Sequence, residues 1–208
     1  YEGTPFENEL NVALRDGIFY VTDATSRKIM QFNSYGDLLM LVYAPQSNPE
    51  PVLLSTVESE GRVTNRRAVS YPFEHVGSLG VSSAGTVFVE DYVDASMREM
   101  DTEARALLRS VILRFNGEGR LVDSIFQNGD AGSPFPFVEG VYATADDGVV
   151  VVSRTSVDRR VYAFDRTSSR EYAVSITSED VPGADPAGIA SLSRIVPDPS
   201  GESLLLKV

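Results

Sequence analysis

The sequence contains no cysteine, which excludes disulfide bridges, thiolate metal ligands and cysteine nucleophiles. This composition fits an exported chain without disulfides and a cytosolic chain equally well. Histidine occurs once, as His75, so a metal site built from several histidines is excluded as well. No apolar run approaches the ~18 residues that a membrane-spanning helix needs, and the longest runs have the length of strands.

Positive charge is scarce, and most of it is arginine. The 208 residues include 30 acidic and 18 basic side chains, giving a net charge of −12, and only Lys28 and Lys207 among the basic residues are lysines. A field of this sign opposes nucleic acids and anionic lipid surfaces, so we expect no nucleic-acid partner. Arginine pairs such as Arg66–Arg67 and Arg159–Arg160 remain suited to bidentate contacts with carboxylates or phosphates.

The most informative feature present is an internal repeat. Each copy has a turn glycine, a β-rich strand, a polar loop, a second strand that ends in Phe followed by Asn or Asp, and another turn. The copies are residues 16–36, residues 84–94 with 111–119, residues 147–169, and a last one that begins at 200–208. Without its insertions each unit is about 50 residues long, a period typical of repeat architectures.

The repeat predicts the fold class. In the first unit, strand-like stretches at 11–14, 18–22, 28–33 and 38–43 are joined by short polar turns, which indicates a four-stranded antiparallel meander. We therefore predict an all-β fold, a β-propeller with about three and a half four-stranded antiparallel blades. Residues 1–208 form a single propeller domain or a fragment of one, with blade units at about 10–44, 75–127, 138–177 and 189–208.

Two insertions interrupt the repeat. Residues 94–110 lack Gly and Pro and carry apolar residues at helical spacings, so we predict a short amphipathic helix capped by Asp94 or Ser96 and lying on one face of the propeller. Residues 45–73 form a long excursion between blades. Its strand-like stretches at 52–57 and 68–71 predict either a hairpin or an irregular loop.

The first unit resembles an NHL-type propeller repeat, which implies propeller architecture. The matching residues are Tyr20, Val21, Asp23, Arg27, Ile29, Phe32 and Gly36. The second unit matches at Val89, Asp91, Ile112, Phe115 and Gly119, whereas the third has Arg154 near the expected acidic residue. The long excursion and the acidic, cysteine-free composition are also similar to NHL-like lipoproteins of spirochaetes. That similarity implies an extracytoplasmic location, in the periplasm or at the cell surface, with membrane attachment only through an N-terminal lipid anchor outside this chain.

The number of units bears on ring closure. The sequence begins at Tyr1 rather than Met, so we expect a processed or trimmed chain. A closed propeller needs at least four blades. We expect an incomplete arc whose open sheet edges could pair two copies into a homodimer. Alternatively, the N-terminal strand or the 45–73 excursion closes the ring.

The loops that follow the second strands are expected to share one face of the propeller. Their charged and aromatic residues are Asp23, Arg27, Asp91, Tyr92, Arg154, Asp158 and Arg159. Mixed charge beside a tyrosine suits recognition of a peptide or polar ligand. We therefore predict a non-enzymatic extracytoplasmic scaffold that binds a protein or other polar ligand, with no catalytic residue, metal or cofactor.

The alternative is a metal-dependent hydrolase or lactonase of the propeller type. Its divalent ion would lie on carboxylates near the axis, for which the candidates are Glu74, Glu139, Asp146 and Asp147. The last two, followed by Gly148, also fit a simple hairpin turn.

Two further features have structural interpretations. Gly77 and Gly80 lack the context of a phosphate-binding loop and are better explained by close packing of an inner strand at the axis. Phe135 lies between Pro134 and Pro136, and Phe137 follows the second proline; these phenylalanines either pack between sheets or dock a partner.

Overall fold

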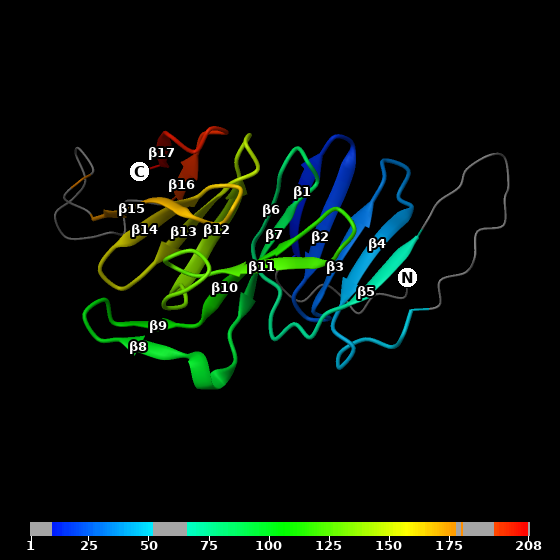
Figure 1. Cartoon of the computed structure of the whole chain (residues 1–208), viewed down its shortest axis with the longest axis horizontal. Helices are drawn as coiled ribbons and strands as arrows, with labels where there is room; N and C mark the ends of the chain where they lie inside the picture. The colour runs from blue at the N-terminus through cyan, green and yellow to red at the C-terminus, as the bar shows by residue number, and fades with distance from the viewer. Residues whose placement is uncertain (1–9, 52–65, 178–179, 181–193, 208) are drawn as a thin grey trace, which may run out of the picture.

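The computed structural model describes residues 10–51, 66–177, 180 and 194–207. Figure 1 shows the main sheets side by side, in chain order from the N-terminal to the C-terminal end of the molecule. The first sheet has the order β1-β2-β3-β4-β5 and is antiparallel except at its last strand. Its strands are β1 (Leu10–Arg15), β2 (Ile18–Asp23), β3 (Lys28–Phe32), β4 (Leu38–Tyr43) and β5 (Arg67–Ser70).

The second and third sheets each have four antiparallel strands. The second contains β6 (Leu79–Val81), β7 (Val87–Tyr92), β10 (Ser110–Phe115) and β11 (Leu121–Ile125). The third contains β12 (Phe137–Ala143), β13 (Val149–Arg154), β14 (Arg159–Phe164) and β15 (Arg170–Ile176). A last antiparallel pair is formed by β16 (Arg194–Pro197) and β17 (Leu204–Lys207). This arrangement confirms the predicted fold class, a partial β-propeller.

The repeated turns close the first hairpin of each unit. Between β1 and β2, Asp16 and Gly17 both have positive φ, of 49° and 76°. Two consecutive residues in this region form the tight hairpin turn that matches the twist of the flanking strands. In the third unit the amide of Thr144 donates to the carbonyl of Gly148 across residues 145–147, which confirms the hairpin interpretation of that segment.

The predicted helix at 94–110 is wrong. Asp94 does cap a short 3₁₀ turn, η1 (Ala95–Met97), but the chain then forms a hairpin of β8 (Glu99–Asp101) and β9 (Ala106–Leu108). The Asp101 carboxylate accepts hydrogen bonds from the amides of Glu103 and Ala104, at 3.1 and 2.9 Å. Such a local side-chain turn competes with helix formation, and the helical spacing of the apolar residues did not reveal it.

The 45–73 excursion is described only in part. Its predicted strand at 52–57, and the turn of a hairpin after it, lie outside the described residues. The predicted strand at 68–71 corresponds closely to β5, which pairs in parallel with β4 and widens the first sheet to five strands.

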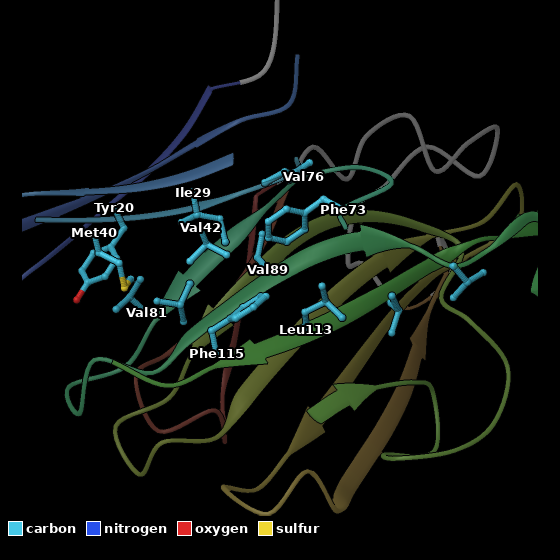
Figure 2. Packing of buried hydrophobic residues seen from close by; sticks show 14 residues of the cluster. Tyr20, Ile29, Met40, Val42, Phe73, Val76, Val81, Val89, Leu113 and Phe115 are labelled. Carbon is cyan, nitrogen blue, oxygen red and sulfur yellow. The ribbon is translucent and has the colours of Figure 1, made fainter. Parts of the chain in front are cut away.

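Three apolar clusters form the core, one between each pair of neighbouring sheets. The first lies between sheets one and two, and Figure 2 shows its labelled side chains meeting in that space. They include Tyr20, Ile29, Met40, Val42, Val81, Val89, Leu113 and Phe115. The second cluster joins sheets two and three, and the third joins sheet three to β16 and β17.

The middle sheets are buried on both faces. In β13, Val149 and Val151 belong to the second cluster, whereas Val150 and Val152 belong to the third. Side chains alternate between the two faces of a strand, so a strand with two buried faces is a continuous apolar run. The run of four valines is therefore explained by the position of β13 between two neighbouring blades.

The inner strands meet at the axis of the arc. β6 lies between β1 and β12 (Figure 1). A side chain at Gly80 would place its Cβ 2.8 Å from the carbonyl oxygen of Val141 and 2.9 Å from the amide nitrogen of Ala143. The interpretation of Gly80 as a close-packing glycine is thus confirmed. On the other side, the side chains of Asn11 and Thr22 both donate to the Gly77 carbonyl at 3.1 Å.

One apolar face of the first sheet is not covered by another blade among the described residues. Val12 and Leu14 are 59% and 61% exposed, and a hollow of about 890 Å³ lined by Met30, Phe32 and Leu41 lies over the same sheet. No helix within the described ranges is long and apolar enough to cross a membrane.

Replacement of Gly80 by alanine is expected to lower the free energy of unfolding by about 2 kcal/mol or more, because two backbone atoms of β12 occupy the space that the methyl group needs. Gly117→Ala is the matched control, since its Cβ would meet its nearest neighbour at 3.8 Å. Urea unfolding of the two variants measures the difference. Equal stabilities would show that the inner strands do not approach as described.

Phe135 and Phe137, on either side of Pro136, should respond differently when each is replaced by alanine. Phe135 is fully buried in the second cluster, so Phe135→Ala is expected to cost about 3–5 kcal/mol. Phe137 is 50% exposed, so Phe137→Ala should cost less than about 1 kcal/mol. Thermal and chemical unfolding of both variants tests this contrast, and similar losses would contradict it.

Candidate functional site

A cavity of about 470 Å³ opens at the axis, where the inner parts of all four units meet. The first unit contributes Asn11 from β1, and the last contributes Arg194 and Ile195 from β16. The other lining residues come from the second and third units and the segments that connect their strands. They are His75, Gly77, Ser78, Glu90, Tyr92, Arg109, Phe137, Val138, Glu139 and Tyr142.

An aromatic stack forms one wall of the cavity. The rings of His75 and Tyr92 lie 4.1 Å apart, centroid to centroid, with an angle of 12° between their planes. The guanidinium carbon of Arg109 lies 4.5 Å from the centroid of the Tyr92 ring, and that of Arg98 lies 5.9 Å from it. Cations favour the faces of aromatic rings, so these contacts hold the Tyr92 ring in a fixed orientation.

Two arginines, Arg109 and Arg194, reach the cavity. Throughout the described part of the chain, no carboxylate lies within ion-pair distance of Arg109 or Arg194. The backbone of Arg109 is nevertheless fixed, since its amide donates to the Phe135 carbonyl at 3.0 Å and its carbonyl accepts from the Val93 amide at 2.8 Å. This guanidinium therefore projects from a rigid position and keeps donors available.

The carboxylates of the cavity, in contrast, are engaged by their own chain. Glu139 accepts from Arg159 at 2.8 Å and lies 3.4 Å from Arg154. The two arginines offset its charge, so Glu139 does not compete for Arg109 or Arg194.

Glu90 is buried against the backbone. Its carboxylate accepts from the Ser110 hydroxyl at 2.8 Å and from the Ser78 amide at 3.3 Å. A Cβ at Gly77 would lie 2.3 Å from Glu90 Oε2 and 3.1 Å from His75 Nε2. The missing side chain at position 77 thus makes room for both groups beside the cavity, which confirms a close-packing role for this second glycine.

Three of the seven residues predicted from the sequence reach this site. Tyr92 lines the cavity directly, and Arg154 and Arg159 hold Glu139 in its wall. The order of strands in each unit predicts that these residues share one face. In the structure, the packing of sheet two against sheet three brings them together.

The other four predicted residues stabilise local structure. Asp23 pairs with Lys28 at 3.6 Å and accepts from the Ser26 amide, and Arg27 donates to the Phe73 carbonyl at 3.4 Å. Asp158 is buried and is hydrogen-bonded by the side chains of Thr155, Arg160 and Ser175. Asp91 is buried and accepts hydrogen bonds from backbone amides beside the cavity.

The loop residues predicted from the sequence do not include most of the residues that line the cavity. The missed polar residues are Asn11, His75, Ser78, Glu90, Arg109 and Arg194. A signal was present for some of them, because polar residues in or just before an inner strand face the axis of a propeller. Arg109 falls within the predicted helix at 94–110, which concealed its place immediately before β10.

The four carboxylates predicted as candidates for a divalent ion do not come together as one group. Glu74 is exposed, Glu139 is paired with arginines, Asp146 accepts from the Thr144 hydroxyl, and Asp147 accepts from the Ala84 amide at 3.4 Å. Over the residues that the structure describes, no three His, Asp or Glu side chains converge as metal ligands. The hydrolase alternative gains no support from the carboxylate positions.

Asp91 is a buried acid that fixes the chain beside the cavity. Asp91 is only 4% exposed. Its carboxylate accepts hydrogen bonds from the backbone amides of Glu74, His75 and Tyr92, at 3.1, 2.6 and 2.7 Å. Burial, together with the charge of Glu74, raises the pKa of Asp91 to about 6 although the three amides act in the opposite direction.

Comparisons with known proteins give a distant structural likeness and no family. A scan against protein-family models finds no match, and a search of the curated proteins finds none. Among solved structures the chain is similar to "Structure of Dos1 propeller", with 10% sequence identity and a TM-score of 0.38. The match covers 80% of this chain, which spans about half (47%) of that protein's chain.

Replacement of Asp91 by asparagine is expected to change how stability depends on pH. The folded-state pKa of about 6 exceeds the unfolded value of 3.8, so between these values the unfolded chain loses the proton first and stability falls as pH rises. The full cost, about 3 kcal/mol, is present above pH 6. Asp91→Asn escapes this cost, so its stability relative to the original chain should rise between pH 4 and pH 7. Denaturant unfolding across this range measures the difference, and a constant difference would contradict the assignment.

Proposed function

We propose that the chain is a β-propeller scaffold that binds a carboxylate-bearing ligand in the axial cavity. The observation that carries the proposal is the presence of Arg109 and Arg194 in the cavity wall, on different units and without carboxylate partners in the described residues. A guanidinium group presents two parallel donors that fit a carboxylate, so two arginines suit a ligand with two such groups.

The remaining wall supports a ligand with an apolar body. Phe137, Tyr142 and the stack of Tyr92 on His75 provide flat apolar surface in the same cavity wall as the two arginines. The cavity is concave and partly shielded from water, which strengthens electrostatic contacts relative to those on the open surface. The net charge of −12 repels anions in general, so only a ligand that reaches the arginines gains from binding.

The location and the repeat type belong to the same proposal. The NHL-type character of the blades is supported by the repeat residues, such as Tyr20, Asp23 and Phe32, and the extracytoplasmic location by the resemblance to NHL-like lipoproteins. Pairing of two copies through open sheet edges stays a prediction.

Titration calorimetry with glutarate, a small dicarboxylate, tests the proposed function. Glutarate is expected to bind the original chain, and Arg109→Gln or Arg194→Gln should weaken binding about tenfold or more, because each removes a charge-assisted contact. Arg120→Gln, at an exposed arginine that pairs with Glu118 and does not line the cavity, is the matched control and should leave the affinity unchanged. Absence of binding, or equal affinities for all variants, would overturn the proposal.

A further inference from the structure

A second hollow of about 330 Å³ lies beside the axial cavity, along the β8–β9 hairpin. It is lined by residues that include Arg105, Leu107, Arg109, Phe137, Arg154 and Ser156. Arg109 and Phe137 also line the axial cavity, so the two hollows adjoin at these residues. Together they form a groove that runs from β16 past β12 to the hairpin.

The hairpin wall of this groove is fixed to the third sheet. The Ser156 amide donates to the Ala104 carbonyl at 3.2 Å, and the Ser156 hydroxyl donates to the Arg105 carbonyl at 3.0 Å. Asp101 forms an ion pair with Arg160 at 3.6 Å. Because contacts at both the turn and the β8 strand hold the hairpin, the groove exists before a ligand arrives, which lowers the entropic cost of binding.

The chemistry of the second hollow continues that of the first. Three arginines line it and no carboxylate does. Arg105 is exposed, and its guanidinium has no acidic partner anywhere in the described part of the chain. Leu107 and Phe137 are 41% and 50% exposed, and Arg154 lies over the Phe137 ring at 5.1 Å. The groove therefore presents Arg194 in the axial cavity, Arg109 and the Phe137 ring where the two hollows adjoin, and Arg105 with Leu107 in the outer hollow.

We infer that this groove binds an extended acidic peptide, with one acidic side chain at Arg194 and Arg109, another at Arg105, and an apolar side chain on Phe137 between them. The inference rests on the proposed function, since Arg109 belongs to both hollows. A small dicarboxylate held at the axis would leave Arg105, Leu107 and the outer hollow unused. In an extended peptide, alternate side chains point the same way at a spacing of about 7 Å, which suits contacts distributed along a groove.

A peptide is favoured over the other polyanions that arginines bind. The net charge of −12 opposes the long-range approach of a nucleic acid, whose affinity depends on many phosphate contacts. The groove also carries exposed apolar side chains, which a phosphate backbone would not use. A short acidic segment needs only the few cationic contacts that the groove offers.

The test uses the intact chain and a capped pentapeptide with the order glutamate, alanine, phenylalanine, alanine, glutamate, with glutarate titrated in parallel. The peptide is expected to bind about tenfold more tightly than glutarate. Arg105→Gln should lower the affinity for the peptide about five- to tenfold without changing the affinity for glutarate, because the charge-assisted contact that is lost lies in the outer hollow. Arg109→Gln should weaken the binding of both ligands, and Arg120→Gln should change the affinity for neither.

The outcomes separate the two proposals. If glutarate binds as expected but Arg105→Gln leaves the peptide affinity unchanged, the groove inference is overturned and the axial site stands. If neither ligand binds, the proposed function itself is overturned. A single-stranded RNA oligonucleotide that binds more tightly than the peptide, and loses affinity in Arg105→Gln, would overturn the choice of a peptide. Far-ultraviolet circular dichroism checks that each variant is folded.

Discussion

The close approach of two inner strands at the axis is the constraint on which the rest of the molecule depends. The backbone of β12 lies where a side chain at Gly80 would be, so β6 and β12 meet with no side chain between them. Sheets that touch along their inner strands must fan outward, and the space between them is filled by apolar side chains such as Phe115 and Phe164. Each neighbouring pair of sheets therefore buries one continuous cluster, and the middle sheets bury both faces. The sheets are held together because their apolar faces pack against one another. Hydrogen bonds to the Gly77 carbonyl fix the position of the first sheet relative to the second.

The same convergence produces the candidate site. Inner strands from four units bring polar residues to one mouth of the axis, although these residues are far apart in the sequence. Burying a charged group is unfavourable unless it is paired or hydrogen-bonded. Glu90 and Glu139 meet this requirement through a serine hydroxyl, a backbone amide and two arginines. Arg109 and Arg194 have no carboxylate partner among the described residues, so their guanidinium donors remain available in the cavity of an acidic protein.

The sequence was a good guide to the blades and a partial guide to the site. Turn residues such as Asp16 and Gly17, and the run of valines in β13, predicted strands and their order because these signals are local. The helix at 94–110 was wrong because helical spacing cannot reveal the turn made by Asp101, nor the contacts of the hairpin with Ser156. Tyr92 could be selected from its place after a second strand. Arg109 and Arg194 could not, because their proximity is set by how separate sheets pack.

A crystal structure of the chain with glutarate bound would show whether the axial cavity is the binding site. We expect electron density for the dicarboxylate inside the cavity, with one carboxylate at Arg109 and the other at Arg194, and with the His75–Tyr92 stack unchanged. Glu139 should keep its contacts with Arg159. Glutarate found outside the cavity, or either cavity arginine paired with a carboxylate of its own chain, would show that the cavity does not bind as proposed.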